Sequence, residues 1–413
     1  MKHKNRPLES LCELYKIGAG PSSSHTMGPQ RVALLMRQAF PQANHFRVTL
    51  FGSLALTGRG HLTDVVLQRT FAPHPCDVVF DHGFSKRHPN SLVVEAYLDQ
   101  TLISTWHADS IGGGSIQIDE YPVERVAANY PWTSMEEMKE DMNASGRSVL
   151  ELVDFYDPQA RSHVEQAWSR MIACIERGLL AEGTIPGALG LEKVAGRLHA
   201  KALDPQQDWG NEEREKMLLS AYAYAVSEEN ASGNEVVIAP TCGAAGVVSA
   251  VMYFFAKQRQ ETTNRIVDAL VIAGVFGNFV KRNATISGAK GGCQAEVGTA
   301  CSMAAAGASY LYGLDFDRIE YAAEVAMEHH LGLTCDPVLG FVQIPCIERN
   351  GAAALRALDA ALYGKHIGNL RKNRVSFDDV VAVMKETGAH LRKDYRETAL
   401  GGLAKKIKRK FGF

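Results

Sequence analysis

Three cysteines in the last third of the chain have the residue type and surroundings to do chemistry: Cys293, Cys335 and Cys346. A glycine precedes Cys293, a proline follows Cys335 by two residues, and a proline precedes Cys346. Glycine and proline mark turns, where backbone N–H groups and thiolates can converge on one ligand. Three thiolates with no obvious fourth suit a [4Fe-4S] cluster whose remaining iron is open to act as a Lewis acid.

The alternative for any cysteine is packing, because free cysteine is among the most buried residue types. Cys12, Cys76 and Cys174 fit that alternative, and Cys301 lies in an alanine-rich helical stretch. Cys242 is harder to assign, because a glycine follows it directly. The sequence has no Cys-x-x-Cys pair, so neither a zinc ribbon nor a ferredoxin-type cluster is supported.

A loop rich in glycine and hydroxyl groups, from Gly18 to Pro29, is the first candidate for substrate binding. Glycine lets the backbone approach a ligand closely. The side chains expected to hold a carboxylate are those of Ser22, Ser24, His25 and Thr26. The alternative is an N-cap, with the proline in the first turn of the helix that follows.

A second glycine-rich loop, residues 52–64, carries His61. Histidine titrates near neutral pH, so His61 is our first candidate for a general base and His25 the second. The alternative for a lone loop histidine is an ordinary surface position. A third glycine loop, residues 109–114, lacks the spacing and the following helix of a P-loop or dinucleotide site, so it is assigned no phosphate role.

Apolar spacing predicts which elements position these loops. The first part of the chain reads as mixed α and β, with helices near Leu8–Ile17 and Arg31–Gln38 and strands at 45–50, 92–98 and 102–106. From residue 134 helical spacing takes over, and beyond Gly190 the chain reads as almost wholly helical. Alanine- and valine-rich helices are expected deep in the bundle at 245–256, 265–280, 301–312 and 318–330. We therefore expect an α+β domain at 1–150 that contributes substrate loops, then a mostly α-helical bundle at 160–413 that carries the iron–sulfur site.

Composition excludes several classes of protein. The formal net charge of −2 over 413 residues argues against a general nucleic-acid binder. The charged N-terminus lacks the apolar core of a signal peptide, and no uninterrupted apolar run reaches the roughly 18 residues of a membrane span. Eight cysteines without a small disulfide framework predict a cytoplasmic protein.

Together, these segments resemble the iron–sulfur-dependent L-serine dehydratases, or L-serine ammonia-lyases. The motifs that carry the resemblance follow one another over nearly the whole chain: Gly20–Thr26, Gly52–Gly58, Ala239–Ala244, Gly292–Gly298, Cys301–Gly307, Gly332–Pro337 and Gln343–Asn350. The resemblance implies a β-type region and an α-type catalytic region fused in one chain. It also implies that Cys293, Cys335 and Cys346 are the three cluster ligands and that His61 lies in the active site.

The chain departs from the family pattern at several positions. Lys290 stands where a glutamate is frequent, His330 where asparagine is common, and Leu339 where a small residue is usual. Some members of the family end in a cysteine that reaches the cluster. This chain is not expected to use that device, because its last residues, 405–413, are mostly basic. These departures bear on substrate preference, and serine, threonine or another β-hydroxy amino acid stays open.

The expected chemistry is an elimination. The β-hydroxyl of serine is a poor leaving group, and coordination to the open iron would help it leave while a histidine removes the α-proton. As the resemblance implies, the resulting aminoacrylate hydrolyses to pyruvate and ammonia. Arg349 and Asn350 are expected to orient the substrate or tune the cluster, although Arg349 could instead pair with Glu348.

Two other functions remain open from the sequence. The first is a pyridoxal-phosphate lyase with Lys290 as its Schiff-base lysine, a reading that leaves the three cysteine loops unexplained. The second is a non-enzymatic iron–sulfur sensor that binds an amino acid and signals through the basic tail. The expected partner is a small-molecule amino acid, and the large apolar helices make a homodimer reasonable.

Overall fold

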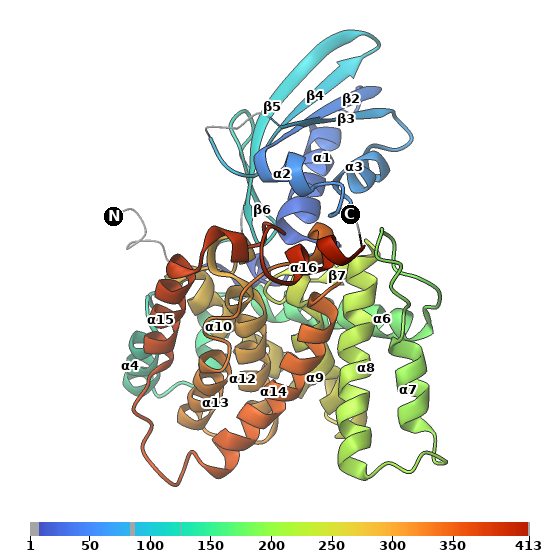
Figure 1. Ribbon diagram of the computed structural model, residues 1–413. Helices are drawn as coiled ribbons and strands as arrows, with labels where there is room; N and C mark the ends of the chain where they lie inside the picture. The colour runs from blue at the N-terminus through green and yellow to red at the C-terminus, as the bar shows by residue number, and fades with distance from the viewer. Residues whose placement is uncertain (1–7, 83–86, 125, 412–413) are drawn as a thin grey trace.

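The computed structural model of the protein describes residues 8–82, 87–124 and 126–411. Figure 1 shows a sheet-containing region from the N-terminal part of the chain standing on one end of a larger bundle of helices. The fold class expected from the sequence is therefore confirmed: an α/β region with a mixed sheet precedes a mostly helical region.

The sheet-containing region has five strands and three helices. In chain order its elements are α1 (Gly28–Ala39), β2 (His45–Phe51), α2 (Gly52–Thr57), α3 (Thr63–Phe71), β3 (Cys76–Asp81), β4 (Ser91–Leu98), β5 (Thr101–Gly112) and β6 (Ser115–Ile118). The strand order is β3-β2-β4-β5-β6, with β2 and β3 parallel and the other neighbours antiparallel.

Alternation along β2 explains which face of the sheet is covered. Phe46, Val48 and Leu50 are buried, whereas Arg47 between them is exposed. Side chains two residues apart share a face of a strand, so this pattern puts one face against a core and the other toward solvent. Helix α1 packs against β4, β5 and β6, and α3 packs against β3. The sheet thereby holds α1 and the loops on either side of α2 in place.

The helical region begins after the sheet and continues to the end of the described chain. Its α-helices are α4 (Met135–Ser145), α5 (Val149–Tyr156), α6 (Ala160–Leu180), α7 (Ala195–Leu203), α8 (Asn211–Ala231), α9 (Ala245–Gln258), α10 (Thr263–Asn283), α11 (Gly288–Gly291), α12 (Thr299–Leu311), α13 (Phe316–Glu328), α14 (Cys346–His366), α15 (Phe377–His390) and α16 (Gly402–Phe411). Short helical turns interrupt the loops: η1 (Leu11–Glu13), η2 (Ser23–Met27), η3 (Cys242–Ala244), η4 (Gln294–Gly298), η5 (Val338–Gly340) and η6 (Lys393–Tyr395).

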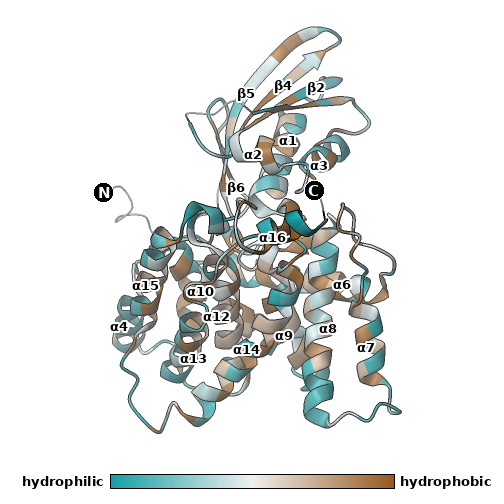
Figure 2. Cartoon of the chain, in the orientation of Figure 1, coloured by the Kyte–Doolittle hydropathy of each residue, from teal (hydrophilic) through white to brown (hydrophobic). Residues whose placement is uncertain are grey.

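The centre of this bundle is apolar, as the alanine- and valine-rich sequence predicts. Every residue of α9 from Ala245 to Phe255 is buried, and α12 is buried along nearly its whole length. Figure 2 shows these central helices in the colours of hydrophobic residues, whereas α4 at the edge is mostly hydrophilic. Helix α10 is long and apolar enough to cross a membrane, but 78% of its most apolar stretch is buried inside the molecule, as in the core helix of a globular protein.

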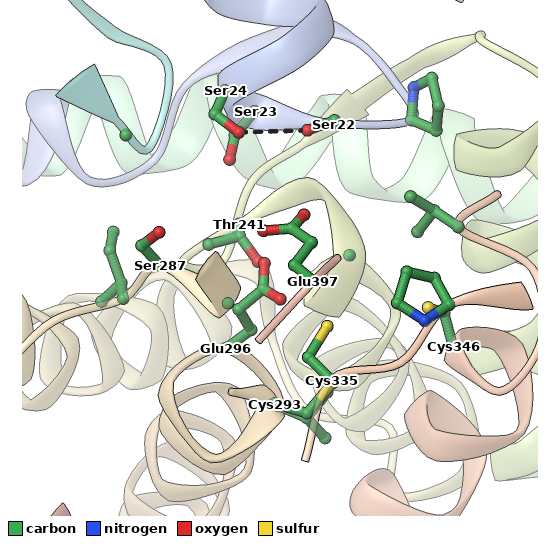
Figure 3. A pocket seen from close by; sticks show the side chains of 18 of the residues that line it. Ser22, Ser23, Ser24, Thr241, Ser287, Cys293, Glu296, Cys335, Cys346 and Glu397 are labelled. Carbon is green, nitrogen blue, oxygen red and sulfur yellow. Dashed lines mark hydrogen bonds between the residues drawn. The ribbon is translucent and has the colours of Figure 1, made fainter. Parts of the chain in front are cut away.

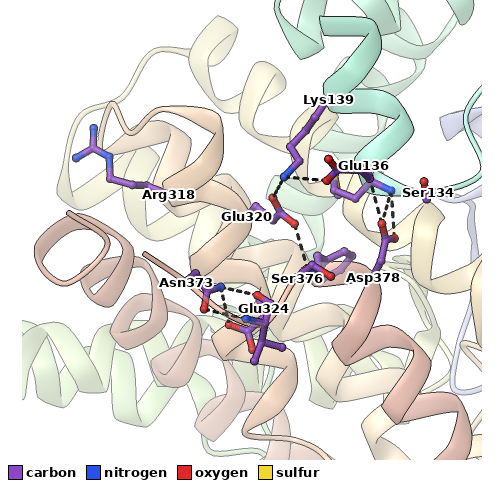
Figure 4. Close-up of polar contacts among 12 residues, drawn as sticks. Ser134, Glu136, Lys139, Arg318, Glu320, Glu324, Asn373, Ser376 and Asp378 are labelled. Carbon is purple, nitrogen blue, oxygen red and sulfur yellow. Dashed lines mark hydrogen bonds and ion pairs between the residues drawn. The ribbon is translucent and has the colours of Figure 1, made fainter. Parts of the chain in front are cut away.

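Helix α4 is attached to this bundle by polar contacts (Figure 4). The Asp378 carboxylate, in the first turn of α15, accepts hydrogen bonds from the Met135 and Glu136 backbone amides, at 2.9 Å from the Met135 nitrogen. Such an acceptor satisfies amide groups that a helix start leaves without partners. The Lys139 ammonium group lies 2.9 Å from the Glu320 carboxylate of α13.

Segments that come before and after the sheet region in the chain both contribute to the bundle core. Apolar residues near the N-terminus (such as Leu11 and Tyr15) and from α4 and α5 (such as Met138 and Leu152) belong to the same buried cluster as the helices after α6. The separate core of the sheet region is formed by residues between Val32 and Ile118. The domain limits of 1–150 and 160–413 stay a prediction.

The helix predicted at Leu8–Ile17 is wrong. The segment instead forms the single turn η1 and then β1 (Ile17–Ala19), which pairs with β7 (Glu235–Val237). The Asp157 carboxylate accepts hydrogen bonds from the Ser10 hydroxyl and the Leu11 amide, at 2.9 and 2.8 Å. The apolar spacing that suggested a helix therefore reflects side chains buried in the bundle core along an irregular segment.

Candidate functional site

A pocket lies at the junction of the two regions (Figure 3). Its polar and sulfur-containing lining residues are Ser22, Ser23, Ser24, Thr241, Ser287, Cys293, Glu296, Cys335, Cys346 and Glu397. In Figure 3, Ser22, Ser23 and Ser24 approach from one side and the cysteines from the opposite side, with Thr241, Glu296 and Glu397 between them. The glycine, serine and cysteine motifs that the sequence singled out are therefore brought together around one space.

All three predicted metal-ligating cysteines face this pocket. Cys293 directly precedes η4, Cys335 pairs with Arg396 in an isolated β-bridge, and Cys346 is the first residue of α14. The Cys293 and Cys335 sulfurs and a Glu296 carboxylate oxygen all lie within 4.8 Å of one another. The three thiols are free, so each is able to bind a metal.

The guanidinium group of Arg349 places a positive charge next to the thiol of Cys293. Its guanidinium donates hydrogen bonds to the Cys293 sulfur at 3.1 Å and to the Thr334 carbonyl at 2.6 Å. The same group lies 3.6 Å from the carboxylate of Asp336, which is 3% exposed. Among the described residues, the ion pair of Arg349 is with Asp336 and not with Glu348. Arg349 does not line the pocket, so its expected effect on the substrate or the cluster stays a prediction.

The chemistry of the three thiols fits a bound metal group. The hydrogen bond to Cys293 and burial raise the pKa of Cys335, and burial together with the charge of Cys293 raises the pKa of Cys346. A cationic metal would stabilise the thiolate forms of Cys335 and Cys346 beside Cys293, because the metal replaces their protons. The donor set therefore fits an iron–sulfur cluster with three cysteine ligands.

The serine loop forms a single π-helical turn, η2, which runs directly into α1. The Ser22 hydroxyl accepts a hydrogen bond from the His25 amide at 3.2 Å, so the predicted N-cap is also present. Ser22, Ser23 and Ser24 line the pocket at the amino end of this helical stretch. Amide groups at a helix start favour anions, so this side of the pocket suits a carboxylate.

His25 and His61 lie behind the serines as a stacked pair. Their ring centroids are 4.5 Å apart, and each side chain is no more than 2% exposed. Both ring nitrogens of His25 form hydrogen bonds, to the Ser24 and Ser53 hydroxyls at 2.9 Å. Burial, followed by the charge of His61, holds the pKa of His25 well below its ordinary value. His25 therefore has both nitrogens occupied in holding the serine loop.

His61 has one nitrogen free. Its Nδ1 lies 3.0 Å from the Thr57 carbonyl oxygen, which fixes the proton on Nδ1. Its buried Nε2 has no hydrogen-bond partner among the described residues. Burial lowers the pKa of His61 to about 4, so the imidazole is neutral at physiological pH. A neutral ring with an unoccupied lone pair can accept a proton.

Two carboxylates that the sequence reasoning did not select also belong to the site. Glu296 lies in η4, three residues after Cys293, and Glu397 lies in the C-terminal segment (residues 391–401) between α15 and α16. Burial raises the pKa of both carboxyl groups, and Glu296 adds to the effect on Glu397. A side chain at Gly288 would collide with Glu296 and come within 3.3 Å of Glu397, so glycine leaves room for both.

Two predicted substrate-binding residues have other contacts. The Thr26 hydroxyl donates to the His61 carbonyl at 2.7 Å and accepts from the Ser22 amide at 3.2 Å, so it connects the serine loop to the histidine loop. The Asn350 side chain bonds the backbones of Gly243, Gly246 and Cys346. Neither side chain lines the pocket, so each position holds the site from behind.

Comparison with known proteins gives matches along almost the whole chain. Residues 10–69 match the family described as serine dehydratase beta chain, and residues 103–404 match the serine dehydratase alpha chain. The L-serine dehydratase of Haemophilus influenzae is 36% identical over 96% of this chain and 99% of its own length. L-serine dehydratase 2 and L-serine dehydratase TdcG of Escherichia coli are 36% and 37% identical over the same shares.

Proposed function

This chain belongs to the serine dehydratase family, with beta-chain and alpha-chain parts in one polypeptide, and from that premise we propose that it is an iron–sulfur-dependent L-serine ammonia-lyase. The reaction removes water from L-serine, and hydrolysis of the resulting aminoacrylate gives pyruvate and ammonia. The substrate is a small molecule, and we place the reaction in the cytoplasm.

One observation carries this proposal: three free thiols line one pocket, and a neutral histidine lies behind its wall, next to the pocket-lining carboxylate of Glu397. Cys293, Cys335 and Cys346 line it directly. Ring nitrogens of His25 and His61 lie within 4.8 Å of the pocket-lining carboxylate of Glu397. A metal-binding thiol set and a base beside one pocket are the two parts that elimination of a hydroxyl group needs.

Cys293, Cys335 and Cys346 would hold a [4Fe-4S] cluster. When bound, the cluster supplies a Lewis acid, because three cysteines leave one of its irons without a protein ligand. Arg349 stabilises the thiolate of Cys293 through its hydrogen bond of 3.1 Å. Neighbours of this kind adjust the charge and basicity of a metal ligand.

The remaining roles fall to side chains of the sheet region. Ser22 and Ser24, at the start of η2, bind the substrate carboxylate with their hydroxyls. His61 Nε2 takes the α-proton of the substrate, and the Thr57 carbonyl holds the ring in the required tautomer. His25 and Thr26 position these groups, since they bond to both the serine loop and the loop of residues 52–64.

The two alternative functions have less structural support. Lys290 is exposed and does not line the pocket, so it is poorly placed to bind pyridoxal phosphate there. The basic residues of the tail form α16, which packs against η5 beside the pocket. A sensor that signals through this helix would hold a cluster without turning over serine, so a turnover assay separates it from the enzyme.

The test is an assay without oxygen. Protein purified anaerobically is mixed with L-serine, and pyruvate is measured over time. A parallel assay with L-threonine measures 2-oxobutanoate, the keto acid that the same reaction would form from that substrate. We expect pyruvate from L-serine at a rate proportional to the iron content of the preparation. A fully iron-loaded protein that forms no pyruvate would contradict the proposal and favour the sensor.

A further inference from the structure

One side of the pocket suits a carboxylate group, and another part of its lining carries two acidic side chains. The serines stand at a helix start on one side, and the carboxylates of Glu296 and Glu397 lie between them and the thiols (Figure 3). An α-amino acid carries a carboxylate and an ammonium group on the same carbon. The proposed carboxylate, hydroxyl and α-proton contacts leave the ammonium group without a partner.

Backbone contacts fix Glu397 in the pocket. The Cys335 amide donates to the Tyr395 carbonyl, and the Glu397 amide donates to the Cys335 carbonyl, both at 2.8 Å. The segment is fixed again at the start of α16, where the Asp336 carboxylate accepts from the Leu403 amide at 2.6 Å. Glu397 itself has a positive φ of 59°, a conformation that costs free energy in a non-glycine residue. These contacts therefore hold the backbone of Glu397 at the wall of the pocket.

In the described part of the chain, no lysine or arginine forms an ion pair with Glu397 or Glu296. Arg349 is committed to Cys293, Thr334 and Asp336. One buried polar atom beside Glu397 also lacks a partner there: His61 Nε2. Buried polar groups are normally satisfied, so this set points to a polar ligand that completes it.

We propose, resting on the proposed function, that Glu397 binds the α-ammonium group of the substrate and so restricts the enzyme to amino acids. The ammonium group and the α-proton are on the same carbon, so the residue that binds the first must lie close to the base that removes the second. A carboxylate oxygen of Glu397 and a ring nitrogen of His61 lie within 4.8 Å of each other. Glu296 lies closer to the thiols, with a carboxylate oxygen within 4.8 Å of the Cys293 and Cys335 sulfurs.

Another ligand for the same residues would be a metal ion held by His25, His61 and Glu397. The stacked rings argue against it, because nearly parallel imidazoles 4.5 Å apart do not direct their lone pairs to one point. Both nitrogens of His25 are also bonded to serine hydroxyls. The ammonium group requires neither histidine to give up its contacts.

The test compares two ligands that differ in the ammonium group alone: L-alanine and propionate. Both carry the carboxylate and neither has a hydroxyl group to lose. Their binding to anaerobically purified holoenzyme is measured by ligand-observed NMR titration, for the wild type and Glu397→Gln. The control is Glu386→Gln, the same change on the exposed side of α15.

We expect Glu397→Gln to weaken the binding of L-alanine about 10- to 100-fold, because one charge-assisted hydrogen bond is lost. The binding of propionate should stay unchanged. Glu386→Gln should bind both ligands like the wild type. In Glu397→Gln the KM for L-serine should rise above that of the wild type as the affinity for L-alanine falls. Equal weakening of both ligands, or no change in L-alanine binding, overturns the assignment.

A second variant covers the case in which Glu397→Gln does not retain iron. Glu397→Asp keeps the carboxylate but places it one methylene group farther from the ligand. The preference for L-alanine over propionate must therefore fall in this variant too. An unchanged preference overturns the proposal. Pyruvate formation by the wild type is scored separately. If the wild type forms none, the proposed function fails, while the L-alanine preference still decides whether Glu397 binds an ammonium group.

Discussion

Replacing His61 by asparagine removes the proposed base while keeping the hydrogen bond that fixes its loop. The Nδ2 group of asparagine can take the place of imidazole Nδ1, 3.0 Å from the Thr57 carbonyl. No atom of asparagine reaches the position of Nε2. The backbone contact with the Thr26 hydroxyl is unaffected, because the His61 carbonyl accepts it.

The expected effect on catalysis is large and the effect on folding small. A general base contributes about 10²- to 10⁴-fold to a rate, so kcat should fall by that factor, or about 2.7 to 5.4 kcal/mol in activation free energy. The loss of stacking on His25 should lower the free energy of unfolding by about 1 kcal/mol. The cluster spectrum and the KM for L-serine should change little.

The assay is steady-state pyruvate formation with L-serine and with L-serine deuterated at the α-carbon. In His61→Asn the removal of the α-proton becomes the slow step, so the isotope effect on kcat should exceed that of the wild type. The matched control is His25→Asn, which we expect to raise KM more than it lowers kcat, because His25 holds Ser24 and Ser53. A His61→Asn enzyme within threefold of the wild type, with an unchanged isotope effect, would refute the assignment of the base.

Three further predictions follow from the same structure. Because burial lowers the pKa of His61 to about 4, its imidazole stays neutral as pH falls through 6.5, so kcat at saturating L-serine should stay level there and fall only toward pH about 4; a drop in kcat centred at pH 6.5 would contradict this. Asp378→Ala removes the hydrogen-bond acceptor at the start of α4, so the free energy of unfolding measured with denaturant should fall by about 1–2 kcal/mol while kcat stays unchanged. A fall in kcat at full iron content would show that the contact does more than hold α4. An iron without a protein thiolate is open to solvent, so activity should decay in air and return with ferrous iron and a reductant; full activity after long aerobic exposure to a chelator is the opposing result.

Much of the helical region could be predicted from the sequence. Helices α9, α10, α12 and α13 were expected within a few residues of their observed ends, because long runs of alanine and valine with helical spacing have few alternatives. The strands β2, β4 and β5 were also expected, since buried and exposed residues alternate along β2. The short pair β1 and β7 was missed, because three-residue strands more than 200 positions apart leave no local pattern.

The site could be predicted in part for a similar reason. The cysteines and His61 stand beside glycines and prolines, so their surroundings drew attention to them. Glu397 follows Cys346 by about 50 residues in a charged segment with no distinguishing spacing. It reaches the pocket through backbone hydrogen bonds to Cys335, a contact that depends on the whole fold of the bundle. Thr26 and Asn350 were predicted to bind substrate, but their hydrogen bonds to backbone groups became visible in the folded chain alone.

The most direct test of the account is the iron and acid-labile sulfide content of protein purified without oxygen, measured together with pyruvate formation. We predict about four irons and four sulfides per wild-type chain, the content of one [4Fe-4S] cluster. Serine substitutions at Cys293, Cys335 and Cys346 should each abolish both the cluster and the activity, whereas Cys174→Ser, in the buried core of α6, should retain them. A colourless wild-type protein that forms pyruvate without iron would contradict the account.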